Sequence, residues 1–330
     1  MKFPALVPIL FMAYVAIGLA EPKTIAVSLA FALAIVLGIK RGEELEWHDN
    51  GLKIREEYIV YAFWLAIGII ALQIIRLGGI PLLHPAIRTS LSPRLTALTY
   101  FLGVPSSVYL FLRGKKYSLL YPIAVSLYAY RTPVLVSVIA IGSAYYETSR
   151  KEGKFNVKKL AGILGGGAIL FLLVTFLRGN GLSSLWVRFQ STVSALDAII
   201  WRGDWSGTYK GYLQWTGVTS YIWGGYSPRG LIAKFLYVHT GATITATLLG
   251  GMYLDFGVFA IVEGFLLGFY YGSISKATHP LTRALYYSTL AYGIVGVETG
   301  ILDLPVYALF LLGAYTVYSG WKVMRKREAR

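Results

Sequence analysis

The sequence predicts an all-α, polytopic transmembrane helical bundle of about ten spans with one large extracytoplasmic loop. Of the 330 residues, 56% are hydrophobic and only 14% are charged, which is far from the composition of soluble domains. Apolar runs near the roughly 20 residues that cross a bilayer recur along the chain. Most of the 31 basic residues lie in the breaks on one side of these runs, as the preference of Lys and Arg for the cytoplasm predicts.

The net charge of +15 and the absence of cysteine exclude several classes of protein. A protein that binds nucleic acid through its charge needs exposed polar surface, which so apolar a chain does not provide, so nucleic acid is excluded as a partner. Without cysteine there are no disulfides, thiolate metal sites, Fe–S clusters or cysteine nucleophiles. The sequence has no phosphate-binding glycine loop and no HExxH motif, so it predicts a site with neither a cofactor nor a metal.

Seven spans are predicted before the large loop. The first resembles a signal peptide, but a second apolar run begins four residues later, which favours a membrane hairpin. The fifth and sixth runs are short and are separated only by Arg131 and Thr132, so they are either two spans or one re-entrant unit. The seven runs are Pro4–Ala20, Thr24–Ile39, Tyr58–Leu77, Leu95–Leu112, Tyr117–Tyr130, Pro133–Tyr146 and Leu160–Leu177.

Three further spans are predicted after the loop: Met252–Ile274, Ala284–Thr299 and Leu304–Gly320. Glu263 lies midway along the first of these, and an ionisable group at that depth is expected to face the bundle interior or a cavity. An even number of spans places both termini in the cytoplasm, so we expect a multi-pass protein of the cell (cytoplasmic) membrane. Residues 1–330 are expected to form a single integral membrane domain, with residues 178–240 as its large extracytoplasmic loop.

The loop is expected to contain an amphipathic interfacial helix. Apolar residues between Leu182 and Ile200 recur at three- and four-residue spacing, and Arg188 falls toward the polar side. The following Arg202–Gly230 stretch is rich in Gly, Tyr and Trp without a helical period, which indicates an ordered functional loop.

Arginine and tryptophan are concentrated in the predicted outer segments. The arginine fork suits bidentate contact with phosphate or carboxylate, although each Arg could instead reach lipid headgroups or pair with Asp197 or Asp204. Tryptophan rings stack on sugars but also occupy membrane interfaces. The tryptophans of the loop are Trp186, Trp201, Trp205, Trp215 and Trp223.

Four titratable residues are candidates for acid–base chemistry. His239 could act as a general base toward a sugar hydroxyl, or it could simply be hydrogen-bonded at a helix start. Asp255, Glu298 and Asp303 lie near the predicted outer ends of spans. Each could orient an acceptor or form an ion pair with one of the arginines.

Three short motifs stand out in the chain. Gly78–Leu83 reads GGIPLL, and Arg131-Thr132-Pro133 places an arginine at a predicted outer turn. The most specific stretch is Ser227-Pro228-Arg229, then Lys234, followed by Thr245–Gly257 and Gly264–Gly268. These motifs resemble those of the Wzy-like O-antigen polymerases, a family of polytopic oligosaccharide repeat-unit polymerases that have an arginine at such a turn, a Pro-Arg in the large loop and a Tyr-x-Asp-Phe-Gly span after it.

The resemblance implies a membrane glycosyltransferase of the GT-C type that acts on the outer face. Its donor and acceptor would be polyprenyl-diphosphate-linked oligosaccharides in membrane lipid, polyprenyl diphosphate would leave, and a chain-length regulator and a flippase are possible partners. Preorganised arginines would stabilise the leaving diphosphate. The expected diphosphate ligands are Arg131, Arg178, Arg188 and Arg229. The expected sugar contacts are Trp201, Trp205, Trp215 and Trp223. His239 is the expected catalytic base, with Asp255 or Glu298 as the alternative.

Other functions remain open at the level of the sequence. A glycan ligase, or a transferase that uses a polyprenyl-phosphate sugar, would use the same arginines. A lipid-linked oligosaccharide flippase would be expected to show inverted repeats and broken helices, and no repeat is visible. A structural subunit would not explain the loop rich in arginine and tryptophan.

Overall fold

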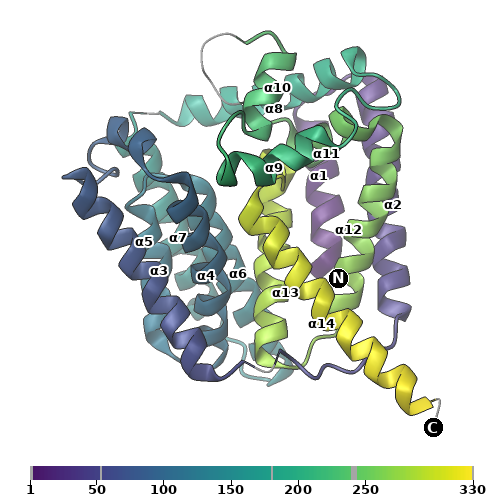
Figure 1. The fold of residues 1–330 in the computed structure, drawn as a ribbon. Coiled ribbons are helices and arrows are strands. Elements are labelled where there is room, and N and C mark those ends of the chain that lie inside the picture. The colour runs from purple at the N-terminus through teal and green to yellow at the C-terminus, as the bar shows by residue number, and fades with distance from the viewer. Residues whose placement is uncertain (1–2, 53, 180, 239–243, 329–330) are drawn as a thin grey trace. The chain divides into compact units, whose positions relative to one another are not determined.

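The computed structural model describes residues 3–52, 54–179, 181–238 and 244–328, and within these ranges the chain is helical and has no β-strand (Figure 1). This agrees with the predicted all-α class. The helices are α1 Leu6–Ile17, α2 Pro22–Glu44, α3 Glu56–Leu77, α4 Pro93–Leu112, α5 Leu120–Ser126, α6 Arg131–Lys151, α7 Val157–Leu177, α8 Leu182–Arg202, α9 Tyr212–Ile222, α10 Pro228–Phe235, α11 Thr247–Phe256, α12 Ala260–Ile274, α13 Pro280–Thr299 and α14 Leu304–Glu328.

Five segments of the described chain are both long and apolar enough to cross a membrane: α2, α3, α4, α7 and the α11–α12 segment. They contain the predicted second, third, fourth, seventh and eighth spans. Helices α6, α13 and α14 have 21, 20 and 25 residues but are more polar. The predicted first span corresponds to a helix of only 12 residues, α1.

The predicted fifth span is not one continuous helix. Within Tyr117–Tyr130 the chain forms the end of a 3-10 turn and then α5, which has seven residues and so rises only about 10 Å of the roughly 30 Å required. Ala129 adopts a left-handed conformation with φ 58°, which ends this helical stretch before α6 begins. This stretch therefore does not cross a membrane as one helix, and the re-entrant alternative fits it better than a full span does.

The described chain packs into two compact units. The first comprises Met1–Glu46, Leu182–Lys276 and Tyr292–Tyr307, and the second comprises Trp47–Gly181, Ala277–Ala291 and Ala308–Arg330. Helices α13 and α14 contribute one part to each unit. The candidate site described below lies within the first unit.

Helices α2 and α12 form the most extensive helix pair of the first unit. Glycine brings their backbones together, because a Cβ on Gly268 would collide with the carbonyl oxygen of Ile35, and one on Gly272 with that of Ile39. In the other direction, a Cβ on Gly38 would collide with the carbonyl oxygen of Phe265. Small residues permit such close approach between membrane helices. The Gly264–Gly268 part of the family-like motif therefore has a packing role.

The predicted eighth span is interrupted at Gly257, which separates α11 from α12. Gly257 has φ 56°, and a Cβ there would collide with the carbonyl oxygen of Trp205. The loop before α9 fills this break, since the amide of Thr208 donates to Leu254 O at 2.8 Å and that of Lys210 donates to Asp255 O at 2.8 Å. The large loop is thus hydrogen-bonded to the end of α11.

Helix α8 corresponds to the amphipathic helix predicted between Leu182 and Ile200. Val193, Leu196 and Ile200 on its apolar face are buried, and α8 packs on α11. Ser191 and Ser194 on the other side are exposed. The burial of the apolar face against protein fixes the direction in which Arg188 projects from α8.

In the second unit, α3 packs against α4 and α6 against α7. A small hydrophobic core of Leu82, Ala129 and Val174 joins the Gly78–Leu83 motif to the turn before α6 and to α7. The amide of Leu82 donates to the carbonyl of Leu127 at 3.0 Å. The first family-like motif therefore packs beside the turn that carries Arg131.

Candidate functional site

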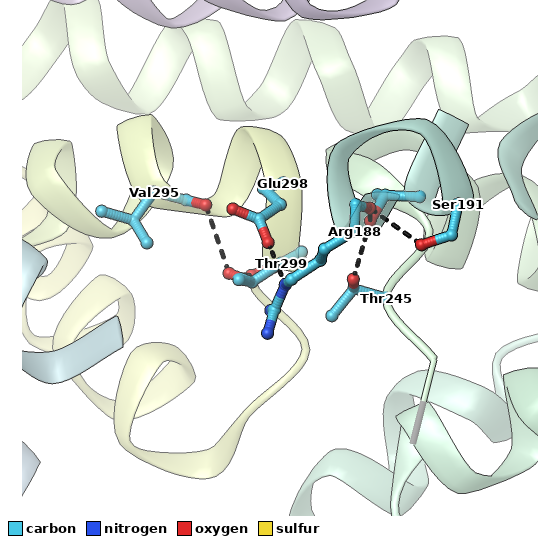
Figure 2. A network of polar contacts seen from close by, with 8 residues as sticks. Arg188, Ser191, Thr245, Val295, Glu298 and Thr299 are labelled. Atoms are coloured by element: carbon cyan, nitrogen blue, oxygen red, sulfur yellow. Dashed lines mark hydrogen bonds and ion pairs between the residues drawn. The ribbon is translucent and has the colours of Figure 1, made fainter. Parts of the chain in front are cut away.

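The first arginine of the site, Arg188, projects from α8 toward the end of α13. Its Nε donates to Glu298 Oε1, and Figure 2 shows the two side chains directed at one another with Thr245 beside them. The side chains of Arg188 and Glu298 are 37% and 34% exposed. The hydroxyl of Thr192 donates to the carbonyl of Arg188 at 2.9 Å and lies 3.2 Å from the hydroxyl of Thr245. Arg188 is therefore held by a carboxylate and linked through Thr192 to the segment before α11.

The second arginine, Arg229, lies in the first turn of α10, whose N-terminus is capped by the Ser227 hydroxyl. A cation is disfavoured at a helix N-terminus, and a carboxylate compensates here, because Arg229 donates to Asp303 Oδ2 at 2.8 Å. The hydroxyl of Tyr221, on α9, donates to Asp303 Oδ1 at 3.3 Å. Burial, together with the negative charge of Asp303, raises the pKa of the Tyr221 hydroxyl above its usual range. Tyr221 therefore stays protonated and able to donate at neutral pH.

A narrow cleft lies beside Arg229 and Asp303. Its enclosed space is about 10 Å³, room for roughly one water-sized atom. The lining residues come from α10, from the segment leading into α11 and from the turn between α13 and α14. They are Pro228, Arg229, Ile232, Thr245, Ala246, Thr247, Gly251, Thr299, Gly300, Leu302 and Asp303. Since Glu298 lies in the last turn of α13 and Asp303 directly precedes α14, the two ion pairs connect α8 and α10 to opposite ends of the α13–α14 turn.

Asp255, predicted as an alternative base, is fully buried and acts as a remote cap for α9. Its carboxylate accepts the backbone amides of Gly211 at 3.2 Å, Leu213 at 2.8 Å and Gln214 at 2.7 Å. Three amide donors occupy most of the accepting capacity of a carboxylate. This geometry gives Asp255 a structural function, that of fixing the start of α9 on α11.

Glu263 is close to Asp255 but contacts a different part of α9. Gln214 Nε2 donates to Glu263 Oε1, whereas Glu263 Oε2 is buried and has no hydrogen-bond partner among the described residues. The expectation that Glu263 faces the protein interior agrees with this burial. The contact places a second polar link between α9 and α12.

The remaining predicted diphosphate ligands belong to the second unit, and one predicted base falls outside the described residues. Arg131 is the first residue of α6, with its guanidinium carbon 5.8 Å from the centre of the Phe171 ring, and Arg178 caps the end of α7. Both belong to the second unit, so the geometry of the first unit has no bearing on their expected role. His239 lies outside the described residues, and its role as a base stays a prediction.

All four tryptophans proposed as sugar contacts are exposed, with exposed fractions from 56% at Trp215 to 72% at Trp223. The ammonium of Lys23 lies 4.8 Å from the centre of the Trp201 ring, at the start of α2. This position beside a candidate membrane span is typical of interfacial tryptophan. Trp223 lies at the end of α9, two residues after Tyr221. Sugar binding stays a prediction for all four.

Three polar residues of this region were missed by sequence reasoning: Tyr221, Gln214 and Thr247. Tyr221 is one of 25 tyrosines, and no local pattern separates it from the others. Gln214 has no neighbouring motif. Thr247 lies within a family-like stretch, where it reads as part of an apolar run, so no signal indicated a separate role.

The sequence profile described as "Putative O-antigen polymerase" matches residues 1–310. The chain belongs to this family. The resemblance of the Pro-Arg and Tyr-x-Asp-Phe-Gly motifs is thereby confirmed at the level of the family. Among curated proteins, an uncharacterized protein of Methanocaldococcus jannaschii is 29% identical over 279 residues, covering 79% of this chain and 77% of the relative. No solved structure matches the chain.

Membership of the O-antigen polymerase family assigns the chain to membrane proteins of polysaccharide synthesis. In this member of the O-antigen polymerase family, the residues of the motif have two different structural roles. Arg229 forms an ion pair at the cleft, whereas Asp255 and Gly257 join the loop to the α11–α12 break. The motif therefore combines one charged residue that lines the cleft with residues that fix its surroundings.

Proposed function

We propose that the protein is a membrane glycosyltransferase that polymerises polyprenyl-diphosphate-linked oligosaccharide repeat units on the outer face of the membrane. The observation that carries this proposal is that two arginines, Arg188 and Arg229, form ion pairs with carboxylates at the two ends of the α13–α14 turn, in a chain of the O-antigen polymerase family. Two guanidinium groups supply the charge and the paired donors that a diphosphate requires. Donor and acceptor are both lipid-linked in this proposal, and a flippase and a chain-length regulator would act beside it.

In the proposed reaction, an acceptor hydroxyl attacks the anomeric carbon of the donor. The new glycosidic bond forms as the bond from that carbon to the diphosphate oxygen breaks, and the bonding electrons leave with polyprenyl diphosphate. Arg188 and Arg229 stabilise the charge that develops on the leaving group. A base takes the proton of the attacking hydroxyl.

Among the described residues, Glu298 is our candidate for the general base. His239, which lies outside the described residues, is the other candidate. Asp255 is less suited, because its carboxylate is occupied by three backbone amides. The carboxylate of Glu298 is paired with Arg188, and that ion pair is about one third exposed. Exposed ion pairs contribute only about 0–1 kcal/mol to stability. A bound diphosphate can therefore replace Glu298 as the partner of Arg188 with a small loss of free energy, and Glu298 is then able to accept a proton.

The proposal is tested with purified protein in nanodiscs supplied with a lipid-linked oligosaccharide. Arg188→Ala and Arg229→Ala should abolish the ladder of products on a gel while the proteins elute as the folded form. Arg202→Ala is the matched control, because Arg202 ends the same helix α8 and is exposed. A normal ladder from both site variants would remove the diphosphate role.

The same assay separates the related activities. A ladder identifies a polymerase, and a single added unit identifies a ligase or a monosaccharide transferase. Unchanged substrate that has crossed the bilayer identifies transport. The last result would contradict the proposed chemistry.

A further inference from the structure

The N-terminus of α11 is buried and lacks a side-chain cap. Ala246 occupies the capping position and provides no hydrogen bond, and Ala246, Thr247, Leu248 and Leu249 are all at most 2% exposed. The first amide groups of a helix have no partner within the helix, so a buried and uncapped start needs an acceptor from elsewhere. A helix start also attracts negative charge through its dipole.

Thr247, the first residue of α11, supplies a second and independent sign of a ligand. The residue is only 2% exposed and lines the cleft. Its side-chain oxygen is buried and has no hydrogen-bond partner among the described residues. A buried hydroxyl without a partner is unfavourable and rare in folded proteins. The hydroxyl is therefore available as a donor to an oxygen that enters the cleft.

The backbone at Thr247 is also unusual. Its φ is 62°, a left-handed conformation that is disfavoured for β-branched residues. Such conformations persist where the surroundings impose them, and they are concentrated at ligand sites. Gly300 of the α13–α14 turn faces the same point, because a Cβ there would lie 3.4 Å from the Thr247 carbonyl oxygen.

We propose that the cleft is an oxyanion subsite that binds one phosphoryl oxygen between the N-terminus of α11, the Thr247 hydroxyl and Arg229. The enclosed space of about 10 Å³ accommodates a single oxygen atom rather than a sugar ring. The phosphoryl group is assigned to the lipid-linked diphosphate, and this assignment rests on the proposed function. Arg229 supplies the charge, and the neutral donors of α11 and Thr247 fix where the oxygen lies.

The test compares Thr247→Val, which keeps the shape and removes the hydroxyl, with Thr247→Ser, which keeps the hydroxyl. Binding of inorganic pyrophosphate to the full chain in dodecyl maltoside is measured by isothermal titration calorimetry. We expect Thr247→Ser to bind within about threefold of the unmodified protein and Thr247→Val to bind about tenfold or more weakly, as loss of a hydrogen bond to a charged group implies. Equal binding by Thr247→Val would overturn the subsite.

Thr316→Val is the matched control for folding. Thr316 is buried, its hydroxyl donates to Gly313 O on its own helix, and it is not one of the residues that line the cleft. Pyrophosphate binding by this variant should equal that of the unmodified protein. A loss equal to that of Thr247→Val would show a general effect of buried Thr-to-Val changes and would also overturn the subsite.

A second arm tests the source of the phosphoryl group. Mixed micelles containing phosphatidylglycerol take the place of pyrophosphate as the titrated ligand, and we expect Thr247→Val to bind this lipid as well as the unmodified protein does. If the variant weakens binding of the lipid headgroup and not of pyrophosphate, the assignment to the diphosphate is wrong. A gel assay of glycan transfer distinguishes failure of the subsite from failure of the proposed function. Pyrophosphate binding that depends on Thr247, without any glycan transfer, would support the oxyanion subsite and contradict the glycosyltransferase activity.

Discussion

Replacing Glu298 with Gln separates the binding and catalytic roles assigned to the Arg188–Glu298 pair. The change removes the carboxylate charge that competes with a diphosphate for Arg188 and keeps the shape of the side chain. The pair is 37% and 34% exposed, so its contribution is about 0–1 kcal/mol. Removing it should therefore tighten pyrophosphate binding by up to about fivefold.

The same variant should be slow in glycan transfer, because an amide does not accept the proton of the attacking hydroxyl. Loss of a general base costs about 10²–10⁴-fold in rate. Pyrophosphate affinity is measured by calorimetry, and transfer is measured as repeat units added per minute on a gel. Glu44→Gln is the control, because Glu44 forms a more exposed ion pair with Arg41 at the end of α2.

Two results would refute this reasoning. Weaker pyrophosphate binding in Glu298→Gln would show that the carboxylate holds Arg188 in its binding position instead of competing for it. Transfer at the unmodified rate would show that Glu298 is not the base and would leave His239 as the candidate.

Three further variants test the surroundings of the site. Gly268→Ala should lower the midpoint of thermal unfolding in detergent, because the added Cβ would collide with the Ile35 carbonyl oxygen and overpacking costs about 1–3 kcal/mol. Gly166→Ala on α7 is the control, since its Cβ would enter open space and should leave the midpoint unchanged. Equal midpoints for the two variants would contradict the close α2–α12 contact. Asp255→Asn should lower stability by about 1.5–3 kcal/mol, measured by thermal unfolding, because it weakens an acceptor of three amides; an unchanged midpoint with lost transfer would instead favour a catalytic role. Tyr221→Phe should make the free energy of unfolding less sensitive to pH above about 10. In the unmodified protein the pKa of Tyr221 is raised in the folded state, so ionisation of Tyr221 in the unfolded chain favours unfolding as pH rises, and the variant lacks this effect. Identical pH profiles of stability would contradict the burial of the Tyr221 hydroxyl.

The spans of α2, α3, α4 and α7 could be predicted because each is one apolar run that forms one helix. For the shorter run Tyr117–Tyr130 the sequence left a full span and part of a re-entrant unit both open, because apolar composition does not report a turn such as the one at Ala129. The interruption at Gly257 was hidden for the same reason. It depends on Trp205 and Gly207 of a distant loop approaching the backbone, and that contact leaves no local pattern.

For the site, the sequence indicated residue types but not their partners. The concentration of arginine in the loop and the choice of Glu298 and Asp303 as possible ion-pair partners both followed from charge. The pairing itself joins Arg188 to a residue 110 positions away and Arg229 to one 74 positions away, which only the fold determines. Thr247 could not be singled out, since its importance lies in burial and in a left-handed backbone.

The measurement that tests the central claim most directly is the amount of polyprenyl diphosphate released per repeat unit added. Purified protein in nanodiscs is incubated with a lipid-linked oligosaccharide, the glycan ladder is measured on a gel, and the released lipid is measured by thin-layer chromatography. The proposed reaction predicts one polyprenyl diphosphate for each glycosidic bond formed, and neither product with Arg229→Ala. A growing ladder that releases polyprenyl monophosphate, or no lipid at all, would contradict it.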